Sequence, residues 1–559
     1  MVHMRSFYWL VCLMLLLGSV GLDKPVAAQI PTAQGGLSVE SATLRADAVR
    51  MKFDPLSQRM LLLSMTGNIT SFDALGGNQR VSSFYQASDH GTPSPVLGMD
   101  IASDGTIYLV GNDAASTPGH NIGVVRRGVP DGNGSHVWET VFITEPYPRS
   151  GTAFDHNMNA IVLSPDEQML YVNSGSRTDH GEVQNGNGQF PDAREVPLTS
   201  MIIRVPADSK NLSLPNNAEQ LSAAGYAFAD GVRNSFSLAF DANGHLYGTE
   251  NSGDRDDHEE LNLLQEGAHY GFPWRMGLTD TPMQFAGYDA ASDLLLNPNA
   301  LAVQGGHFYT DPSYPAVPSS IQFTDPILNL GPDANLYRDP LDGIIKDASL
   351  TGEPIASFTS HRSPLGLVFD TDESLADPYK GDAFVLSWTG PESGLLGSFE
   401  GEGEDLLHLT FESGGSGNAM TVQKLVTGFQ NPIDAELLQG HLYVLEFGSG
   451  SRVWKVSFPG NVGSDVTIPA QALRLDIFPN PLARHINLTI HSPISARYTV
   501  ELLDVTGRSV ARLFEGFLTQ GDHHLSRFLE RTPAGVYLLS VQSESGERLV
   551  KKIVATRSR

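Results

Sequence analysis

The sequence predicts an all-β protein, a six-bladed β-propeller followed by a small β-sandwich domain. One hairpin pattern recurs six times: an alternating apolar run, a turn with Asp, Asn, Gly or Pro, and a second apolar run. Long stretches with helical periodicity are almost absent. Since 40% of the 559 residues are hydrophobic, the chain can build a full core, which excludes a mostly disordered protein.

The first 28 residues are predicted to be a signal peptide. A positive charge at Arg5 precedes an apolar run, and small residues lead to Ala28, after which we expect cleavage. The run is short for a membrane span, and an uncleaved anchor is the alternative. Cys12, the only cysteine, leaves with the signal, so we expect no disulfide and no Cys-ligated metal. No later apolar run is long enough to predict a transmembrane segment in the mature chain.

The predicted propeller occupies residues 29–458. Asp, Asn and Gly tolerate the backbone angles of tight hairpins, and their recurrence at variable spacing is typical of blades with inserts. An array of β-sandwiches is the alternative, but it would not repeat one hairpin pattern six times. The long insert at 277–348 is expected to shape one face of the propeller. The six hairpins begin at Val49, Leu97, Asn159, Ser237, Leu365 and Pro432.

A separate C-terminal module is predicted at 473–559, after a linker at 459–472. Its alternating strands indicate a small antiparallel sandwich, and a sugar-binding sandwich module is one interpretation. It also resembles the C-terminal sorting domain of type IX secretion cargo, which implies export by the type IX machinery of a Gram-negative bacterium, via the periplasm, to the surface or the medium. The matching motifs are Phe478-Pro-Asn-Pro481, Leu503-Asp-Val-Thr-Gly-Arg508, Ala534-Gly-Val-Tyr537 and Lys551-Lys552.

The charge balance limits the partners. The chain has 36 Lys and Arg against 63 Asp and Glu residues, a formal net charge of −27. Nucleic-acid binding needs clustered Lys and Arg, so this balance argues against a nucleic-acid partner. It is typical of a soluble, secreted protein, and solubility alone or cation binding explains it.

The chemistry-bearing residues lie around the third and fourth hairpins. Asp155 and His156 precede the third hairpin, and a His beside a carboxylate is a general-base arrangement; a structural histidine is the alternative. The fourth hairpin is followed by five carboxylates in seven residues. Their oxygens suit Ca²⁺, and an exposed acidic loop is the alternative. These carboxylates are Asp254, Asp256, Asp257, Glu259 and Glu260.

Residues 231–274 resemble the glucose/sorbosone dehydrogenase family, the soluble quinoprotein sugar dehydrogenases. The resemblance extends over about residues 45–458. It implies a six-bladed propeller, pyrroloquinoline quinone (PQQ) and Ca²⁺ as cofactors, and oxidation of an aldose or related polyol. The matching motifs are Asp155-His156-Asn157, Arg233-Asn234, Gly248-Thr-Glu250, Glu260-Leu-Asn-Leu263 and Tyr270-Gly-Phe-Pro-Trp274.

The resemblance also implies residue roles. His156 matches the general base that takes the hydroxyl proton while hydride passes to the quinone, and Asp155 matches a carboxylate that touches the substrate. Arg233 and Asn234 match a pair that contacts the quinone, where an arginine would stabilise charge developing on its oxygen.

Four more positions match calcium sites of the family. Gly253 and Asp254 fall where backbone carbonyls hold the cofactor's Ca²⁺. Glu260 and Tyr270 match a second Ca²⁺ site.

Some positions depart from the family pattern. Phe236 stands where the family has a glutamine, and no basic residue aligns at 387–390 or 429–432, where the family brings a lysine and two arginines to the quinone carboxylates. Loss of three cations weakens the binding of a tricarboxylate. Arg362 and Trp388 are the candidate substitutes, as a cation and a stacking ring, and a structural role is the alternative for each.

The sequence therefore favours an exported PQQ- and calcium-dependent oxidoreductase that transfers hydride from a sugar to the quinone. The missing basic residues favour a catalytically silent propeller that binds glycans or acts at the surface. A Ca²⁺-dependent lactonase is a third hypothesis, which needs carboxylates converging on an axial metal. Serine-nucleophile catalysis has no support, because the chain has no Gly-x-Ser-x-Gly elbow.

Overall fold

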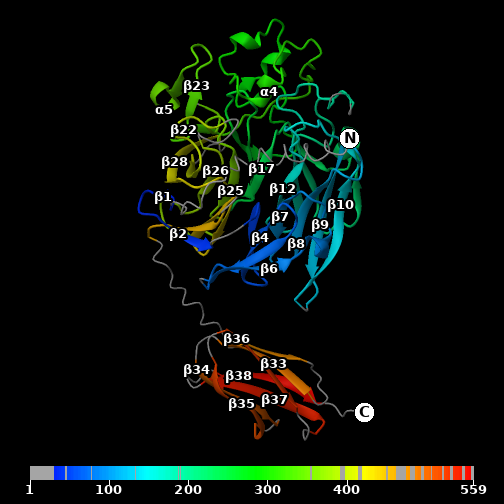
Figure 1. The fold of residues 1–559 in the computed structure, drawn as a ribbon, viewed down its shortest axis with the longest axis vertical. Helices are drawn as coiled ribbons and strands as arrows, with labels where there is room; N and C mark the ends of the chain where they lie inside the picture. The colour runs from blue at the N-terminus through cyan, green and yellow to red at the C-terminus, as the bar shows by residue number, and fades with distance from the viewer. Residues whose placement is uncertain are drawn as a thin grey trace, which may run out of the picture. The chain divides into compact units, whose positions relative to one another are not determined.

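The structure, a computed structural model, is almost entirely β (Figure 1). The predicted signal peptide, most of the predicted linker and Pro479–Pro481 lie outside the described residues. Among the described residues, no helix is long and apolar enough to cross a bilayer. The structure describes residues 30–43, 47–76, 78–132, 134–186, 188, 191–352, 355–390, 397–412, 418–448, 451–460, 474–478, 485–492, 496–504, 507–518, 521–528, 533–543 and 548–555.

The chain forms two compact units, Met1–Asn461 and Val462–Arg559. In the first unit, six sheets each contain one of the predicted hairpins, whose two strands pair antiparallel. The paired strands are β3 (Arg50–Asp54) with β4 (Arg59–Leu63), β7 (Val96–Ile101) with β8 (Ile107–Asp113), β12 (Met158–Leu163) with β13 (Met169–Ser174), β17 (Ser235–Phe240) with β18 (Leu246–Glu250), β25 (Pro364–Phe369) with β26 (Ala383–Ser387), and β29 (Pro432–Leu438) with β30 (His441–Glu446).

Further strands extend these sheets outward. The last sheet is completed by the N-terminal strand β2 (Ser38–Thr43), which pairs with β31 (Val453–Ser457) and so joins the two ends of the unit. The other added strands are β5 (Ile69–Asp73), β6 (Asn78–Tyr85), β9 (His120–Pro130), β10 (His136–Thr144), β11 (Tyr147–Pro148), β14 (Met201–Pro206), β15 (Leu212–Leu214), β16 (Ala227–Asp230), β19 (Glu260–Leu264), β22 (Leu328–Pro332), β27 (Asp405–Phe411), β28 (Ala419–Thr427) and β1 (Thr32–Ala33).

The first strands of the hairpins contact one another in a cyclic order. β3 contacts β7, β7 contacts β12, β12 contacts β17, β17 contacts β25, β25 contacts β29, and β29 contacts β3. Buried side chains fill the space between neighbouring sheets, as Leu61 and Leu63 of β4 do with Val96 of β7 and Leu109 of β8. Each sheet is therefore buried against its neighbours, which explains why its central strands are apolar on both faces.

Arg50 ties together first strands that are far apart in the sequence. Its Nε donates to the carbonyl of Leu97 (2.8 Å) and its Nη2 to the carbonyl of Phe236 (2.7 Å). The guanidinium also lies 3.9 Å from the centre of the Phe236 ring. Phe236, the departure from the family's glutamine, therefore packs against a buried cation.

The insert at 277–348 is built from short elements. Helix α4 (Leu301–Gln304) packs through Ala302 on Phe154, directly before the predicted catalytic pair. The insert thus lies against the segment that carries His156. Its elements and the other short ones are α2 (Ala87–His90), α3 (Ala218–Ala223), β20 (Arg275–Met276), β21 (Thr279–Asp280), η1 (Pro282–Gln284), η2 (Ala290–Ser292), β23 (Leu336–Arg338), β24 (Ile345–Asp347) and α5 (Ala348–Thr351).

The second unit consists of two antiparallel sheets. One buried cluster contains side chains from both, such as Leu475 and Leu488 of one sheet and Val500 and Leu539 of the other. The sheets are β32 (Arg474–Phe478), β33 (His485–Ser492) and β36 (Gly521–Phe528), and β35 (Ser509–Leu518), β34 (Ala496–Leu503), β37 (Gly535–Ser543) and β38 (Arg548–Ala555).

Candidate functional site

His156 lies where the chain enters β12. Its ring Nδ1 is 3.1 Å from Ser176 Oγ and 3.3 Å from the Ser176 carbonyl. Ser176 Oγ donates its hydrogen to the carbonyl of Thr178 (2.9 Å), so both serine oxygens accept from Nδ1. Nδ1 therefore carries the ring proton, and Nε2 carries the lone pair. The Phe154 carbonyl also lies near the ring, and among the described residues no group donates a hydrogen bond to Nε2.

The surroundings keep this imidazole neutral. Burial and the positive charge of Arg233 lower the pKa of His156 to about 3, although the negative charge of Asp179 acts in the opposite direction. The ring is therefore uncharged at neutral pH, and its free nitrogen is available to accept a proton.

Gly175 brings His156 and Asn234 together. A Cβ at this position would lie 2.5 Å from His156 Cβ and 3.2 Å from Asn234 Oδ1, so a larger residue would push them apart. Asn234 Oδ1 accepts a hydrogen bond from Asn159 Nδ2 (2.8 Å), which fixes the orientation of the Asn234 amide. Two of the predicted site residues are thus neighbours in space, although 78 positions separate them in the sequence.

Asp155 organises the loop that precedes it. Its carboxylate oxygens accept backbone N–H groups from Ser150 (2.8 Å) and Gly151 (2.9 Å), and Arg149 Nε lies 3.5 Å away. Burial raises the pKa of Asp155, and the charge of Arg149 opposes that rise. These contacts hold the segment that carries His156 to the loop at 149–151.

Arg233 is buried, and the protein holds its guanidinium. Nε donates to the Asp179 carbonyl (2.8 Å), Nη1 to the Ser252 carbonyl (2.8 Å), and Nη2 lies 3.1 Å from Asp179 Oδ1. The backbone N–H of Arg233 donates to Glu250 Oε2 (2.7 Å). All three guanidinium nitrogens of Arg233 thus have protein partners, so Arg233 acts on other groups mainly through its positive charge.

Asp179 and His180 belong to the site, and the sequence analysis missed them. His180 Nδ1 lies 2.8 Å from Asp179 Oδ2. Burial opposes ionisation of Asp179, but this hydrogen bond and the charge of Arg233 lower its pKa to about 2. The sequence carried a signal, because Asp179-His180 repeats the Asp-His pair found at 155–156.

The first predicted calcium position lies on the loop after β18. Gly253 packs against Asp179, where a Cβ would come within 3.0 Å of the Asp179 carbonyl. Asp254 Oδ2 accepts from the backbone N–H of Ala302 in the insert (2.6 Å). Burial and the negative charge of Asp179 raise the pKa of Asp254 to about 6.

The second predicted calcium position contains two buried carboxylates. Glu260 of β19 lies opposite Glu250 of β18 in the strand register. Burial, and for Glu250 also the charge of Glu260, raise the pKa of Glu250 to about 8 and that of Glu260 to about 7. The Tyr270 hydroxyl donates to the Leu263 carbonyl (2.6 Å), so the phenol supports β19. In the described part of the chain, no group of three or more His, Cys, Asp or Glu side chains is placed to hold a metal ion, and the lactonase hypothesis gains no support.

Arg362 and Trp388 have partners of their own. Arg362 is fully buried between Glu402 and Asp405, with Nη2 2.5 Å from Asp405 Oδ1. Its charge is therefore balanced inside the protein, which favours a structural role over a contact with a cofactor. Trp388 packs in a buried cluster with Phe236.

Several buried polar atoms near the ends of β18 and β26 lack a hydrogen-bond partner in the described structure. Unsatisfied buried polar atoms cost free energy unless a ligand or water pairs with them. Asn251 and Ser252 lie beside Arg233, which bonds to their carbonyls, so their unpaired atoms fit a polar group bound at this end of the hairpins. These atoms are Asn251 Oδ1, Ser252 Oγ, Glu259 Oε2, Ser360 Oγ and Trp388 Nε1.

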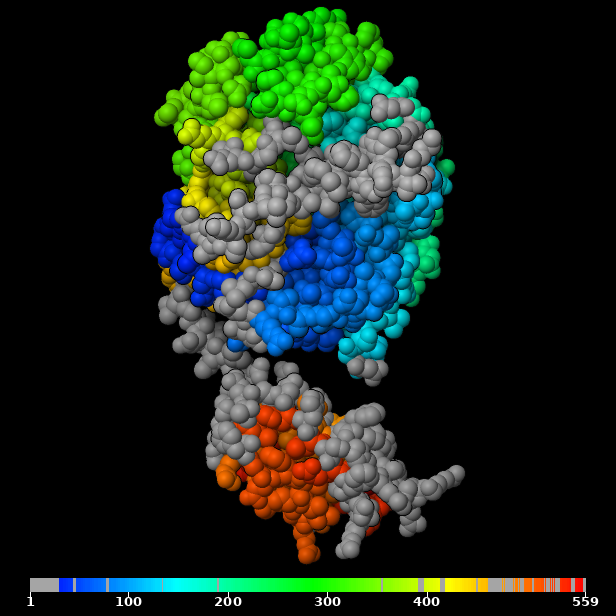
Figure 2. Space-filling view, in the orientation of Figure 1, coloured from blue at the N-terminus to red at the C-terminus, as the bar shows by residue number. Residues whose placement is uncertain are grey.

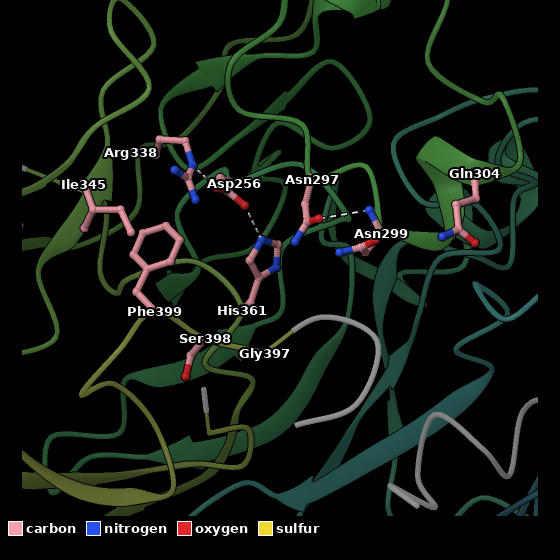
Figure 3. A pocket seen from close by; sticks show the side chains of 10 residues that line it. All are labelled: Asp256, Asn297, Asn299, Gln304, Arg338, Ile345, His361, Gly397, Ser398 and Phe399. Atoms are coloured by element: carbon pink, nitrogen blue, oxygen red, sulfur yellow. Dashed lines mark hydrogen bonds and ion pairs between the residues drawn. The ribbon is translucent and has the colours of Figure 1, made fainter. Parts of the chain in front are cut away.

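A cavity of about 590 Å³ opens beside the loop that follows β18 and the segment that precedes β25 (Figure 3). Asp256 and His361 form its centre, and the insert at 277–348 supplies several of its other side chains. His361 lines the cavity, whereas its sequence neighbour Arg362, the predicted cofactor-binding cation, does not. Figure 2 shows the insert, in green, as a continuous part of the surface of the first unit.

Residues 47–321 match the family model of glucose/sorbosone dehydrogenases, and residues 476–556 match that of the secretion system C-terminal sorting domain. The first match includes His156, Arg233, Asn234 and Glu260. Both resemblances found in the sequence are thereby confirmed.

No curated protein matches the chain. Similar solved structures include the PQQ-bound aldose sugar dehydrogenase from Streptomyces coelicolor (16% identity, TM-score 0.44, covering 76% of this chain and 99% of that one). Others are the apo-form of the soluble aldose sugar dehydrogenase from Escherichia coli (16% identity, TM-score 0.47, 75% and 99%) and the holo form of the pyranose dehydrogenase PQQ domain from Coprinopsis cinerea (13% identity, TM-score 0.47, 78% and 98%).

Proposed function

We propose that this chain, whose residues 47–321 belong to the glucose/sorbosone dehydrogenase family, is an exported PQQ- and calcium-dependent oxidoreductase that oxidises an aldose or related polyol. The observation that carries the proposal is the state of His156. Its Nδ1 proton is held by Ser176, and its Nε2 presents a lone pair without a protein partner. That is the arrangement a general base needs to take the proton of a sugar hydroxyl.

The residues around His156 fit a polar cofactor. The unpartnered polar atoms at Asn251 and Ser252 and the amide of Asn234 would hold it, with the charge of Arg233 beside it. When bound, PQQ supplies an acceptor for the hydride. In this proposal His156 receives the hydroxyl proton at Nε2, and Asp155 keeps the segment that carries His156 in place.

One calcium site is proposed at the loop after β18 and a second at β19 and the segment that follows it. Gly253 and Asp254 would take part in the first and Glu260 and Tyr270 in the second. The raised pKa values of Asp254, Glu250 and Glu260 support this assignment, because a divalent cation would stabilise their charged forms.

We also propose that residues 29–458 form a six-bladed propeller and 473–559 a β-sandwich, with a signal peptide at 1–28 and a linker at 459–472. The cyclic contacts of the six first strands support the propeller, and the cluster shared by two sheets supports the sandwich. The match at 476–556 supports export by the type IX machinery of a Gram-negative bacterium, through the periplasm to the surface or the medium.

A catalytically silent, glycan-binding propeller is the second candidate. The ion pairs of Arg362 favour it, since they remove a cation that would otherwise face the quinone carboxylates.

The experiment is oxidation of aldoses with an artificial electron acceptor by the full mature chain loaded with PQQ and Ca²⁺. His156→Ala is expected to lower kcat by about 10²–10⁴-fold, the usual contribution of a general base. His245→Ala is the control, because His245 is an exposed histidine that bonds only to Asp241 among the described residues. The general-base role is rejected if His156→Ala stays fully active, and absence of oxidation with every aldose rejects the dehydrogenase.

A further inference from the structure

The cavity of about 590 Å³ joins parts of the chain that are far apart in the sequence. Asp256 follows β18, His361 precedes β25, and Asn297, Asn299, Gln304 and Arg338 come from the insert (Figure 3). The insert therefore contributes most of the polar groups that a ligand in this cavity would meet.

An ionic cluster fixes the middle of the cavity. Asp256 Oδ1 lies 2.7 Å from His361 Nε2, and Asp256 Oδ2 lies 2.5 Å from Arg338 Nε. Arg338 Nη1 also donates to the Gly343 carbonyl (2.9 Å), and the guanidinium lies 5.3 Å from the centre of the Phe399 ring. The side chains of Asp256, His361 and Arg338 are thus held in place before any ligand binds.

The charges of this cluster are largely balanced. His361 faces Asp256 directly, and Glu259 and Asp254 also lie close enough to raise its pKa against the effect of burial. The guanidinium of Arg338 is therefore matched by a carboxylate of the protein, so it offers little net attraction to an anion.

Neutral hydrogen-bonding groups form another part of the lining. The side-chain amides of Asn299 and Gln304 are exposed and make no hydrogen bond to the described residues. Asn297 Oδ1 accepts from the backbone N–H of Asn299 (2.9 Å), which orients its amide. Amides both donate and accept, as hydroxyl groups do, and Phe399 and Ile345 add apolar surface.

The cavity shares an element with the candidate catalytic segment. Gln304 lies in α4, whose Ala302 packs on Phe154 and donates its N–H to Asp254. A ligand held by α4 would lie on the element that supports the segment carrying His156.

We propose that this cavity is a saccharide-binding site, in which the amides of the insert and the fixed Asp256–Arg338 pair hydrogen-bond the hydroxyl groups of a neutral sugar. The inference rests on the proposed function for the class of ligand, and it names the insert as the part of the chain that recognises the sugar. The amides and the balanced charges favour a neutral polyol over an anion, and the few apolar groups disfavour an apolar ligand.

The test measures binding without catalysis. Saturation-transfer NMR is recorded on the cofactor-free full mature chain with D-glucose, D-galactose, D-xylose, cellobiose and maltotriose. We expect transfer to at least one of them, and at least a tenfold higher Kd for the double variant Asn299→Ala/Gln304→Ala. Both side chains are exposed and make no hydrogen bond to the described residues, so the variant is expected to fold normally. Asn243→Ala, in the exposed turn between β17 and β18, is the control.

Three outcomes overturn the proposal: no transfer to any of the five sugars, binding that the double variant leaves unchanged, or binding of D-glucuronate at least tenfold tighter than that of glucose. Loss of PQQ binding in the double variant, with no sugar bound by the wild type, would assign the cavity to the cofactor instead. If the chain binds a sugar but oxidises none, this inference stands and the proposed oxidoreductase function is rejected.

Discussion

At the scale of single residues, Ser176 decides which nitrogen of His156 can act as a base. Its hydroxyl hydrogen is already donated to the Thr178 carbonyl, so both of its oxygens accept from Nδ1. The dipeptide Asp155-His156 indicated a base, but its two members do not pair: Asp155 bonds to the loop at 149–151.

The low pKa of His156 predicts a specific acid sensitivity. Between about pH 6.5, its usual pKa, and about pH 3, the unfolded chain binds a proton that the folded chain does not. Stability is therefore lost as the pH falls below 6.5. Denaturant unfolding at pH 7 and pH 5 should show that the wild type loses up to about 2 kcal/mol more than His156→Gln, since each pKa unit corresponds to about 1.4 kcal/mol. An equal loss in both proteins would contradict the lowered pKa.

Arg362 predicts a large effect on stability. Replacement by Leu leaves Glu402 and Asp405 buried without their partner, which typically costs about 3–5 kcal/mol. Urea unfolding measures the change. Lys380→Leu is the matched control, because its ion pair with Glu373 is exposed and is expected to contribute at most about 1 kcal/mol. Unchanged stability of Arg362→Leu together with weaker PQQ binding would restore the cofactor role.

At the scale of elements, β18 and β19 place two glutamates face to face. Strand register, not distance along the chain, makes Glu250 and Glu260 neighbours. The motif at 248–263 indicated Glu260 as a metal ligand through family resemblance, but the electrostatic partner across the strands became visible only from the pairing.

This pair predicts that the calcium-free protein loses stability as the pH rises from about 5 to about 8. The folded-state pKa of Glu250 is raised to about 8, so the folded chain keeps a proton that the unfolded chain releases near pH 4.5. Its contribution to stability is complete below pH 4.5 and is lost as the pH rises through 8. The Tm in EDTA should therefore fall between pH 5 and pH 8, and Glu250→Gln should flatten that slope. A slope identical in wild type and variant would show that Glu250 titrates normally.

At the scale of the whole molecule, the candidate site is assembled by the order in which the six sheets contact one another, because no single sheet carries all of its residues. The first strands β3, β7, β12, β17, β25 and β29 contact one another in cyclic order. The segments that precede and follow the six hairpins therefore meet at the same end of the assembled sheets. This arrangement explains how the segments at 155–156, 233–234, 251–256 and 361 come together.

The division of the chain into two compact units predicts that the first unit folds without the second. Each has its own buried clusters, so removal of residues 473–559 is expected to leave the melting transition of the first unit unchanged. The truncated protein should remain in the periplasm of the producing cell if the tail is the sorting signal. Calorimetry and cell fractionation, with the full chain as the reference, measure the two effects. A Tm several degrees lower would contradict independent folding, and normal export would contradict the sorting role.

The sequence by itself determined the β class, the six hairpins and both family resemblances, because alternating apolar patterns, turn residues and short motifs are local properties of the chain. It also indicated His156, Arg233 and Asn234 as candidate site residues, since the motifs that carry them are contiguous. Tertiary structure alone decided the rest: that Arg362 is neutralised by Glu402 and Asp405, that Asp179 holds Arg233, and that the insert forms a cavity with His361. These are contacts between segments up to more than a hundred residues apart, and a charge or a hydrogen bond across such a separation leaves no local pattern in the sequence.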